Sequence, residues 1–365
     1  MKAVGFIKEA CLASNEWSMN VNSRERVLTA LKLGKPDRVP WVESSVHNAL
    51  AEKLLGRGDF EKATVTQRFS APGLRIPPEV LEVIALDNLT FSIAPPRFAK
   101  SRLYQGMEMI SDGQIKTEGD LEKIKLPDPQ DDALYRPAME FITRFRNDKV
   151  ANDKALGVVC RMGISNTYLS MGMGHFCLTL YDNPEFVLRV IDVFNDWCCH
   201  VVEKVNELGF DFMIVPEDMA WKSAPLFSPE MIREFFLPRM RRFAERVKIP
   251  WIYHSDGNIM PIIEDLLSLG MNGLANIEPG AMDIGQLKKD YGQRFCLMGN
   301  IDLHYTLTLG TPEETEAEVR QRIEEVGVGG GYILASSNGL TSYCKPENVM
   351  AMNDALLKYG HYSAS

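Results

Sequence analysis

The sequence lacks the features that mark membrane and nucleic-acid-binding proteins. No apolar run approaches the roughly 18–20 residues that a helix needs to cross a bilayer, and residues 1–9 have no apolar core of the kind found in secretory signals. Lys and Arg number 40 against 49 Asp and Glu, which gives a net charge of −9, and they form no basic cluster. We therefore expect a cytoplasmic protein that binds neither membranes nor nucleic acid.

Several chemical motifs are also missing. The seven cysteines are scattered and no CxxC occurs, so we expect reduced, mostly buried thiols rather than disulfides. No GxGxxG follows a predicted strand, which argues against a nucleotide-binding sheet. No GxSxG is present, and lysine is absent from the predicted strand ends, so a serine nucleophile and a Schiff base are both disfavoured.

Regular alternation of strand and helix patterns is the main feature of the 365 residues. Eight strands are predicted at 39–43, 88–93, 156–162, 210–215, 251–254, 273–277, 295–299 and 332–335. Helices are predicted at 23–33, 133–148, 183–207, 228–247, 259–269, 283–290, 312–326 and 346–358. This pattern favours a (β/α)₈ TIM barrel, in the α/β class, over a doubly wound open sheet. We expect an N-terminal extension at 1–21 and one barrel domain at 22–365, with a β-hairpin excursion at 108–117 that turns at Asp112-Gly113.

The most informative stretch is residues 249–258, where an apolar strand ends in His254-Ser255-Asp256 before Gly257. This pattern places an imidazole and a carboxylate at the carboxyl end of a strand, where α/β proteins bind ligands. A helix cap formed by Asp256 or Asn258, with a hydrogen-bonded histidine beside it, is the alternative interpretation.

Polar residues follow the other predicted strands as well, and two chemistries fit them. One is a divalent metal held by His254 and Glu217, with Asp256 or another acid as a further ligand. The other is metal-free acid–base catalysis by carboxylates with shifted pKa values. The candidate catalytic residues are Asp256, Asp87, Arg161 and Asn338, and the candidate substrate-binding residues are His47, Met171, Tyr168, Glu278 and Asn300. The local context of His47 also allows a purely structural role, and the Met-rich stretch around Met171 also fits a core patch.

Several motifs together resemble those of the uroporphyrinogen decarboxylase superfamily. They are Arg24-Glu25-Arg26-Val27-Leu28, Lys35-Pro36-Asp37-Arg38-Val39-Pro40, Ser228-Pro229-Glu230, Glu234-Phe235-Phe236-Leu237-Pro238, His254-Ser255-Asp256-Gly257-Asn258, Asn276-Ile277-Glu278-Pro279, Gly299-Asn300-Ile301-Asp302 and Pro346-Glu347-Asn348-Val349. The resemblance spans roughly residues 22–358 and implies a (β/α)₈ barrel, as the alternation does.

The superfamily contains two kinds of enzyme. True decarboxylases carry an arginine-rich loop after the first strand, where this sequence has Glu43-Ser44-Ser45-Val46-His47-Asn48. An acid there has the wrong sign for a substrate with eight carboxylates. Asp87 is similar to the acid that decarboxylases place after their second strand, so the resemblance keeps this activity as an alternative, with Asp87 and Arg161 as its polar groups.

The other members are methyltransferases that work with corrinoid proteins. Their thiol-methylating members bind zinc through His-x-Cys and a later Cys, where this chain has His254-Ser255-Asp256 and Ser336 or Ser337. Relatives that demethylate aromatic methyl ethers use Glu and His, and the resemblance implies Glu217 and His254, with Glu234 as the nearest second Glu. We expect a zinc-dependent methyltransferase that moves a methyl group from a small methylated substrate, such as a methoxyaromatic, to a corrinoid protein. We also expect a homodimer. A non-catalytic ligand-binding barrel is a further alternative.

Overall fold

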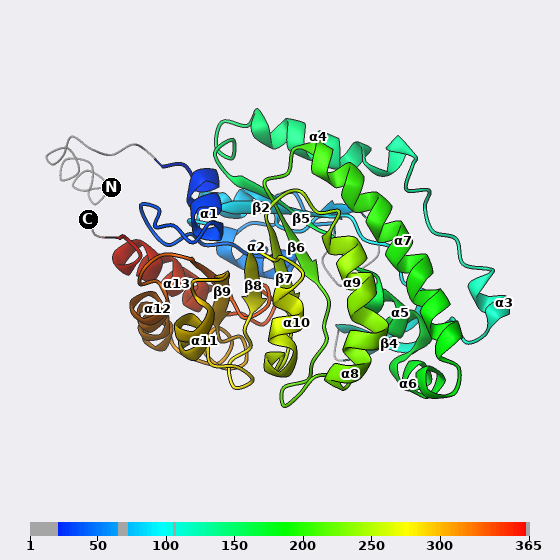
Figure 1. Cartoon of the computed structure of the whole chain (residues 1–365). Coiled ribbons are helices and arrows are strands. Elements are labelled where there is room, and N and C mark those ends of the chain that lie inside the picture. The colour runs from blue at the N-terminus through cyan, green and yellow to red at the C-terminus, as the bar shows by residue number, and fades with distance from the viewer. Residues whose placement is uncertain (1–20, 65–71, 105–106, 363–365) are drawn as a thin grey trace, which may run out of the picture.

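The computed structural model describes residues 21–64, 72–104 and 107–362, and the predicted extension at 1–21 lies almost wholly outside these ranges. Figure 1 shows strands at the centre of the molecule with helices around them. Eight strands form one sheet in the order β1-β2-β5-β6-β7-β8-β9-β10. Their bounds are Gly73–Leu74 (β1), Asn88–Ser92 (β2), Ala155–Val159 (β5), Phe212–Pro216 (β6), Trp251–Ser255 (β7), Gly273–Asn276 (β8), Cys296–Ile301 (β9) and Tyr332–Ser336 (β10).

All neighbouring strands from β2 to β10 are parallel, and only the two-residue β1 is antiparallel to its neighbour β2. Parallel neighbours joined by helical crossovers are the repeating unit of a TIM barrel. The predicted fold class is therefore confirmed. Because the strands are parallel, their carboxyl ends share one rim, which is the usual position of active sites in such barrels.

The predicted first strand at 39–43 is wrong as a strand, but the segment closes the barrel. Trp41 forms a single parallel bridge with Leu334 of β10, and the backbone N–H of Trp41 donates to the carboxylate of Asp87 at 2.8 Å. The N–H of Glu43 donates to the side chain of Asn88 at 3.0 Å. Side chains therefore accept the hydrogen bonds that strand carbonyls would accept in a regular ladder, and Pro40 has no N–H to contribute. The segment joins β10 to β2 without becoming a ladder strand itself.

A compact apolar cluster fills the barrel interior and positions its inward-facing residues. Val27, Ala30 and Leu31 of helix α1 (Ser23–Leu31) pack there against alternate residues of the strands. The strand members are Ala155, Val159, Phe212, Ile214, Ile252, Ala275, Cys296, Met298, Ile333 and Ala335, together with Val42 of the closing segment. Residues two apart on a strand share a face, so this cluster identifies which side of each strand faces inward.

The helices surround the sheet, and a second, larger apolar cluster lies between helices and strands. The remaining α-helices are Asn48–Leu55 (α2), Glu118–Leu121 (α3), Arg136–Arg146 (α4), Ile164–Met171 (α5), Met173–Asp182 (α6), Pro184–Leu208 (α7), Pro229–Met231 (α8), Leu237–Ala244 (α9), Ile263–Leu267 (α10), Ile284–Tyr291 (α11), Pro312–Val326 (α12) and Pro346–Tyr359 (α13). Short 3₁₀ turns lie at Pro78–Glu82, Asp132–Leu134 and Met260–Ile262, and a π-helical turn lies at Ile232–Phe236. Most predicted helices are confirmed, while α5 and α6 were not predicted. Gly172, with φ of 80°, separates these two helices in the Met-rich stretch around Met171.

The predicted hairpin exists, but its turn was placed wrongly. Strands β3 (Ala99–Tyr104) and β4 (Met107–Gly113) pair with each other outside the main sheet. Asp112 and Gly113 lie at the far end of β4, opposite Lys100 and Ala99, and not at the turn. A close contact explains the glycine, since a Cβ on Gly113 would stand 2.2 Å from the backbone at Met171 and Gly172.

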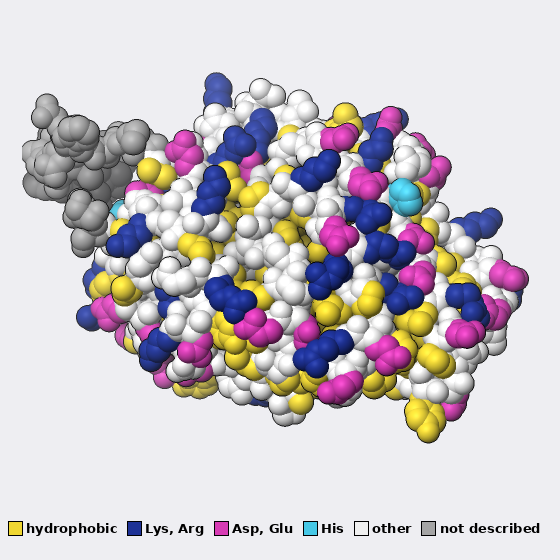
Figure 2. All heavy atoms as spheres, in the orientation of Figure 1, with side chains coloured by type: hydrophobic (Ala, Val, Ile, Leu, Met, Phe, Trp, Pro, Cys, Tyr) yellow, Lys and Arg dark blue, Asp and Glu magenta, His cyan; other side chains and the backbone are white. Residues whose placement is uncertain are grey.

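The surface agrees with the charge pattern of the sequence. On the face shown in Figure 2, basic and acidic side chains are interspersed rather than segregated. None of the helices in the described ranges is both long and apolar enough to cross a bilayer.

Candidate functional site

The alternation along two neighbouring strands points Asp218, His254 and Asp256 into the mouth of the barrel. Ile214 and Ile252 belong to the interior cluster, so residues 216 and 254 share their inward side. His254 is the fourth residue of β7 and is 8% exposed. Asp218 and Asp256 continue from the carboxyl ends of β6 and β7. The two strands are paired in register at Pro216 and His254, which brings the three side chains together.

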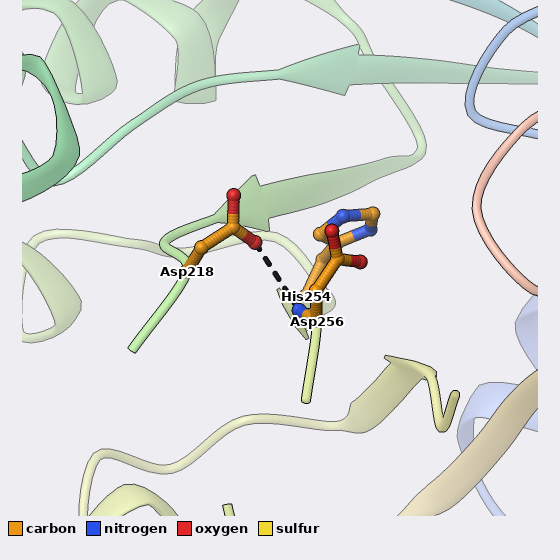
Figure 3. Close-up of side chains that lie close together, drawn as sticks. All are labelled: Asp218, His254 and Asp256. Carbon is orange, nitrogen blue, oxygen red and sulfur yellow. Dashed lines mark hydrogen bonds between the residues drawn. The ribbon is translucent and has the colours of Figure 1, made fainter. Parts of the chain in front are cut away.

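These three side chains form the cluster best suited to hold a cation. One potential ligand atom from each of Asp218, His254 and Asp256 lies within 4.8 Å of the other two, and no other such group of three occurs in the part of the chain that the structure describes. Figure 3 shows the three side chains together at the strand ends. One imidazole and two carboxylates are a donor set that zinc uses in catalytic sites, where a fourth position stays open. The residues present therefore fit a divalent metal.

Neighbouring polar groups hold the cluster in place. The side-chain amide of Asn276 donates to the Nε2 atom of His254 at 3.0 Å. It also donates, in a shorter contact, to Oδ1 of Asp256. Asn338 donates to the same carboxylate oxygen at 3.2 Å. The backbone N–H of Asp256 donates to Asp218 at 3.2 Å (the dashed line in Figure 3), and the hydroxyl of Tyr168 donates to the backbone carbonyl of Asp218 at 3.1 Å. Two side-chain amides and the N–H of Asp256 thus hold the carboxylates and the imidazole relative to one another, and the phenol of Tyr168 holds the backbone at Asp218.

His254 is kept neutral by its surroundings. Burial is the main cause that lowers the pKa of His254 to about 4, and the guanidinium groups of Arg161 and Arg75 lower it further, while Asp218 opposes the shift. A neutral imidazole keeps one ring nitrogen unprotonated, and this nitrogen would exchange its hydrogen bond from Asn276 for a bond to a metal. The cluster therefore offers an unprotonated nitrogen at neutral pH.

Glu217, which was predicted as a metal ligand, lies next to the cluster but faces the other way. It is fully buried, and its two oxygens accept hydrogen bonds from the backbone N–H groups of Met162, Gly163 and Ser165 at 2.6–2.9 Å. These N–H groups stand at the start of α5, so the carboxylate anchors the loop between β5 and α5. Burial raises the pKa of Glu217.

Arg161 lies at the end of β5, on the rim where it was expected. Its Nη1 donates to the hydroxyl of Ser165 at 2.9 Å and to the carbonyl of Pro216 at 3.0 Å. Pro216 pairs with His254 across the β6–β7 ladder, so Arg161 stands one strand away from the imidazole.

Three other candidates lie away from the cluster. Asp87 directly precedes β2, which places it at the opposite end of the barrel, where it pairs with Arg26 and Arg38. Glu234 is exposed on the π-helical turn outside the barrel. His47 caps the start of α2, where its Nδ1 accepts a hydrogen bond from the N–H of Ala49.

The remaining candidates surround the rim at different depths. Tyr168 and Met171 are buried on α5. Of these two, Tyr168 contacts the cluster, through a hydrogen bond from its hydroxyl to the backbone carbonyl of Asp218. Glu278 accepts a hydrogen bond from the N–H of Gly257, just after Asp256. Asn300 continues the inward side of Met298 on β9, and its amide donates to the carbonyl of Ile277 at 2.7 Å.

Three residues that the sequence analysis did not select belong to the site. Asp218 was passed over in favour of Glu217, although alternation from Ile214 would have placed Asp218 on the inward side. Asn276 adopts a φ of 76°, so alternation along β8 could not have predicted where its side chain points. Arg75 follows β1, a strand that no sequence pattern indicated.

The family of the chain follows from a comparison with known proteins. A model of the family described as "Uroporphyrinogen decarboxylase (URO-D)" matches residues 109–359, which is more than half of the chain. The chain belongs to the uroporphyrinogen decarboxylase family. The expected resemblance is thereby confirmed.

Relatives within this family are enzymes of two kinds. The methylcobamide:CoM methyltransferase MtaA of Methanosarcina barkeri is 28% identical over 171 residues, which are 47% of this chain and 48% of that protein. The chain thus matches about half the length of this relative. The uroporphyrinogen decarboxylase of Alkalilimnicola ehrlichii is 24% identical, and the match covers 93% of this chain and 94% of that protein. A solved methyltransferase structure from Methanosarcina mazei shares the fold with a TM-score of 0.71, at 20% identity, over 93% of this chain and 99% of that one.

Proposed function

We propose that this protein is a methyltransferase that moves a methyl group from a small methylated substrate, such as a methoxyaromatic, to a corrinoid protein. The observation that carries the proposal is the cluster of Asp218, His254 and Asp256 at the carboxyl ends of β6 and β7. The similarity to a methylcobamide:CoM methyltransferase supports methyl transfer as the reaction class.

Zinc is the proposed metal, and Asp218, His254 and Asp256 would hold it in place of the earlier set of His254, Glu217 and Glu234. When bound, such an ion acts as a Lewis acid on the atom that carries the methyl group. Oxygen and nitrogen ligands leave more positive charge on the ion than thiolates would. This donor set therefore suits an ether oxygen, which is a poor leaving group without such help.

The chain's own residues keep this arrangement in place. Asn276 and Asn338 orient Asp256, and Tyr168 and the backbone of Asp256 orient Asp218. His254 is 8% exposed, so little water reaches its ring. The fixed positions of these groups lower the cost of organising the site when substrate binds.

The test is metal analysis of the purified full-length chain, beside three variants. We expect about one zinc per chain in the wild type, and loss of that zinc in His254→Ala and in Asp218→Asn. His200→Ala is the matched control, since it removes an exposed imidazole from α7, far from the rim, and should leave the zinc content unchanged. Wild-type zinc content in His254→Ala would refute the site.

A decarboxylase of the uroporphyrinogen type is the second candidate, and one observation favours it. Arg75 and Arg161 both act electrostatically on His254, and Arg97 acts on Tyr168, so three guanidinium groups lie near the site. The two functions differ in what they consume. Demethylation of a methoxyaromatic in the presence of a reduced corrinoid protein would support methyl transfer. Turnover of uroporphyrinogen, without turnover of any methyl donor, would establish the alternative.

A further inference from the structure

Arg75 is a partly buried arginine whose positive charge has no counterion among the residues that the structure describes. It follows β1, and its backbone N–H donates to the carbonyl of Thr90 at 2.9 Å. Its Nε donates to the carbonyl of Ser44 at 2.8 Å. Its two terminal amino groups make no hydrogen bond or ion pair with any residue in the described ranges. Four N–H bonds of the guanidinium are therefore available to a ligand.

Hydrogen bonds connect Arg75 to the candidate metal cluster. Ser44, which accepts from Arg75 Nε, donates its hydroxyl to the carbonyl of Asn338 at 2.9 Å. The side chain of Asn338 in turn donates to Asp256 at 3.2 Å. The guanidinium thus lies on the same rim as Asp256, on the side of the mouth formed by β1 and the closing segment.

Arg161 approaches the same region from the β5 side. It donates to Pro216, which is paired with His254. Burial is the main cause that lowers the pKa of Arg75 to about 10, and repulsion from the positive charge of Arg161 contributes to the shift. Within the described parts of the chain, no carboxylate offsets this effect at Arg75. A positive charge that is partly removed from water without a counterion is costly, and groups of this kind cluster at functional sites, where a ligand can supply the opposite charge.

We propose that Arg75, with Arg161 beside it, binds a carboxylate group of the substrate next to the candidate metal cluster. The planar guanidinium presents paired N–H groups that match the two oxygens of a carboxylate. The assignment of the cluster as the reacting centre rests on the proposed function, and the substrate class then becomes a small methylated carboxylic acid. Arg75 would set specificity by holding the acid group while the methyl group faces His254.

Calorimetric binding to the full-length chain tests the proposal without any turnover. The acidic probes are para-methoxybenzoate and methoxyacetate, and the neutral control is para-methoxybenzyl alcohol. We expect at least one acid to bind in a saturable way, and the alcohol to bind about 10- to 100-fold more weakly than the benzoate, as expected for loss of a charged hydrogen-bonded pair. Arg75→Gln should weaken acid binding by a similar factor, and Arg75→Lys by less.

Matched variants make the result specific. Arg136→Gln removes one exposed positive charge from α4 and should leave acid binding unchanged, which controls for the net charge of the protein. Thermal unfolding of each variant verifies the fold. The proposal is overturned if neither acid binds, if the acid and the alcohol bind equally, or if folded Arg75→Gln binds acid as the wild type does.

Failure of the subsite and failure of the proposed function remain distinguishable. His254→Ala should lose zinc yet still bind the acid, because Arg75 is held by Ser44 and not by the cluster. Acid binding that depends on Arg75, with no methyl transfer from any probe, would count against the methyltransferase and support the subsite.

Discussion

Two acids that are adjacent in the sequence have opposite surroundings at the end of β6. Glu217 faces outward, where three backbone N–H groups occupy its oxygens, whereas Asp218 faces the mouth of the barrel beside His254 and Asp256. The difference is one step along the chain, which reverses the direction of the side chain. The two residues therefore offer a matched pair for separating structural from metal-binding roles.

Glu217→Gln should destabilise the protein while zinc is retained. The glutamine oxygen can still accept from Met162 and Gly163, but its amino group would face the N–H of Ser165 at the position of Oε2. A buried N–H left without an acceptor costs about 1–3 kcal/mol. Urea denaturation measures the loss, and metal analysis of the same sample measures the zinc.

Asp218→Asn is the counterpart, with the opposite pattern. It should lose zinc, while its stability stays nearer to that of the wild type, because Tyr168 contacts its backbone carbonyl and not its side chain. Zinc loss in Glu217→Gln with unchanged stability would show that Glu217, and not Asp218, is the ligand.

Individual residues show how far the sequence could go at this scale. His254 and Asp256 were predictable because an apolar strand with regular alternation leads straight into them. Asp218 was within reach of the same argument, since Ile214 shares its side. Asn276 was not, because its positive φ breaks the alternation, and only the folded backbone shows that its amide joins His254 to Asp256.

At the scale of elements, buried carboxylates join helix α1 to the barrel, and that of Asp87 makes the most contacts, beside that of Asp211, which pairs with Arg24. Asp87 pairs with Arg26 of α1 at 2.6 Å and with Arg38 at 3.0 Å, and it also accepts from the N–H of Trp41. Asp87 itself is fully buried, and the side chains of both arginines are at most 10% exposed. These contacts join α1, the closing segment and β2 at the end of the barrel away from the rim.

Asp87→Ala should therefore lower stability and leave the site intact. Removing one partner of a buried ion pair typically costs about 3–5 kcal/mol, since the other charge is left unpaired. Urea denaturation should show this loss, while zinc content and binding of para-methoxybenzoate to the remaining folded protein stay at wild-type values. A catalytic role, as in the decarboxylase interpretation, predicts instead that activity is lost while stability is unchanged.

The elements that the sequence failed to predict have physical explanations. The segment at 39–43 has the composition of a strand. On the side of β2, however, the backbone N–H groups of Trp41 and Glu43 donate to the side chains of Asp87 and Asn88 and not to strand carbonyls. Asp112-Gly113 is a frequent hairpin turn, but here the glycine is needed for close contact with the backbone near Met171. Both outcomes depend on residues distant in sequence, whereas helices with Pro and acids in the first turn, such as α12, were predicted from local signals.

At the scale of the whole molecule, closure of the barrel depends on a second buried carboxyl group, that of Glu43. It is fully buried between the closing segment and β10, where it accepts hydrogen bonds from the indole of Trp41 at 2.9 Å and from the N–H and hydroxyl of Ser336 at 2.8 and 2.7 Å. Burial raises the pKa of Glu43 from 4.5 to about 7, although these hydrogen bonds oppose the shift. The closed barrel thus binds a proton more tightly than the unfolded chain does.

This linkage predicts that stability falls as pH rises from about 4.5 to 7. In that range the folded state retains the proton on Glu43 while the unfolded state has released it, so the free energy of unfolding decreases with pH and levels off above the folded pKa. A shift of this size corresponds to about 3 kcal/mol. Urea denaturation at pH 5.5, 7.0 and 8.5, the three values chosen to bracket the transition at about 7, measures the change.

Glu43→Gln should abolish this contribution, because a glutamine reproduces the neutral carboxyl group. Its oxygen can accept from Trp41 and from the N–H of Ser336, and its amino group can donate to the Ser336 hydroxyl. The variant should therefore be more stable than the wild type at pH 8.5, and the difference should be smaller at pH 5.5, where the wild type has lost only part of the contribution. Glu43→Ala, which leaves Trp41 and Ser336 without an acceptor, should be less stable than Glu43→Gln at every pH. Equal pH dependence in the wild type and Glu43→Gln would mean that Glu43 is ionised inside the folded barrel and that other groups govern its response to pH.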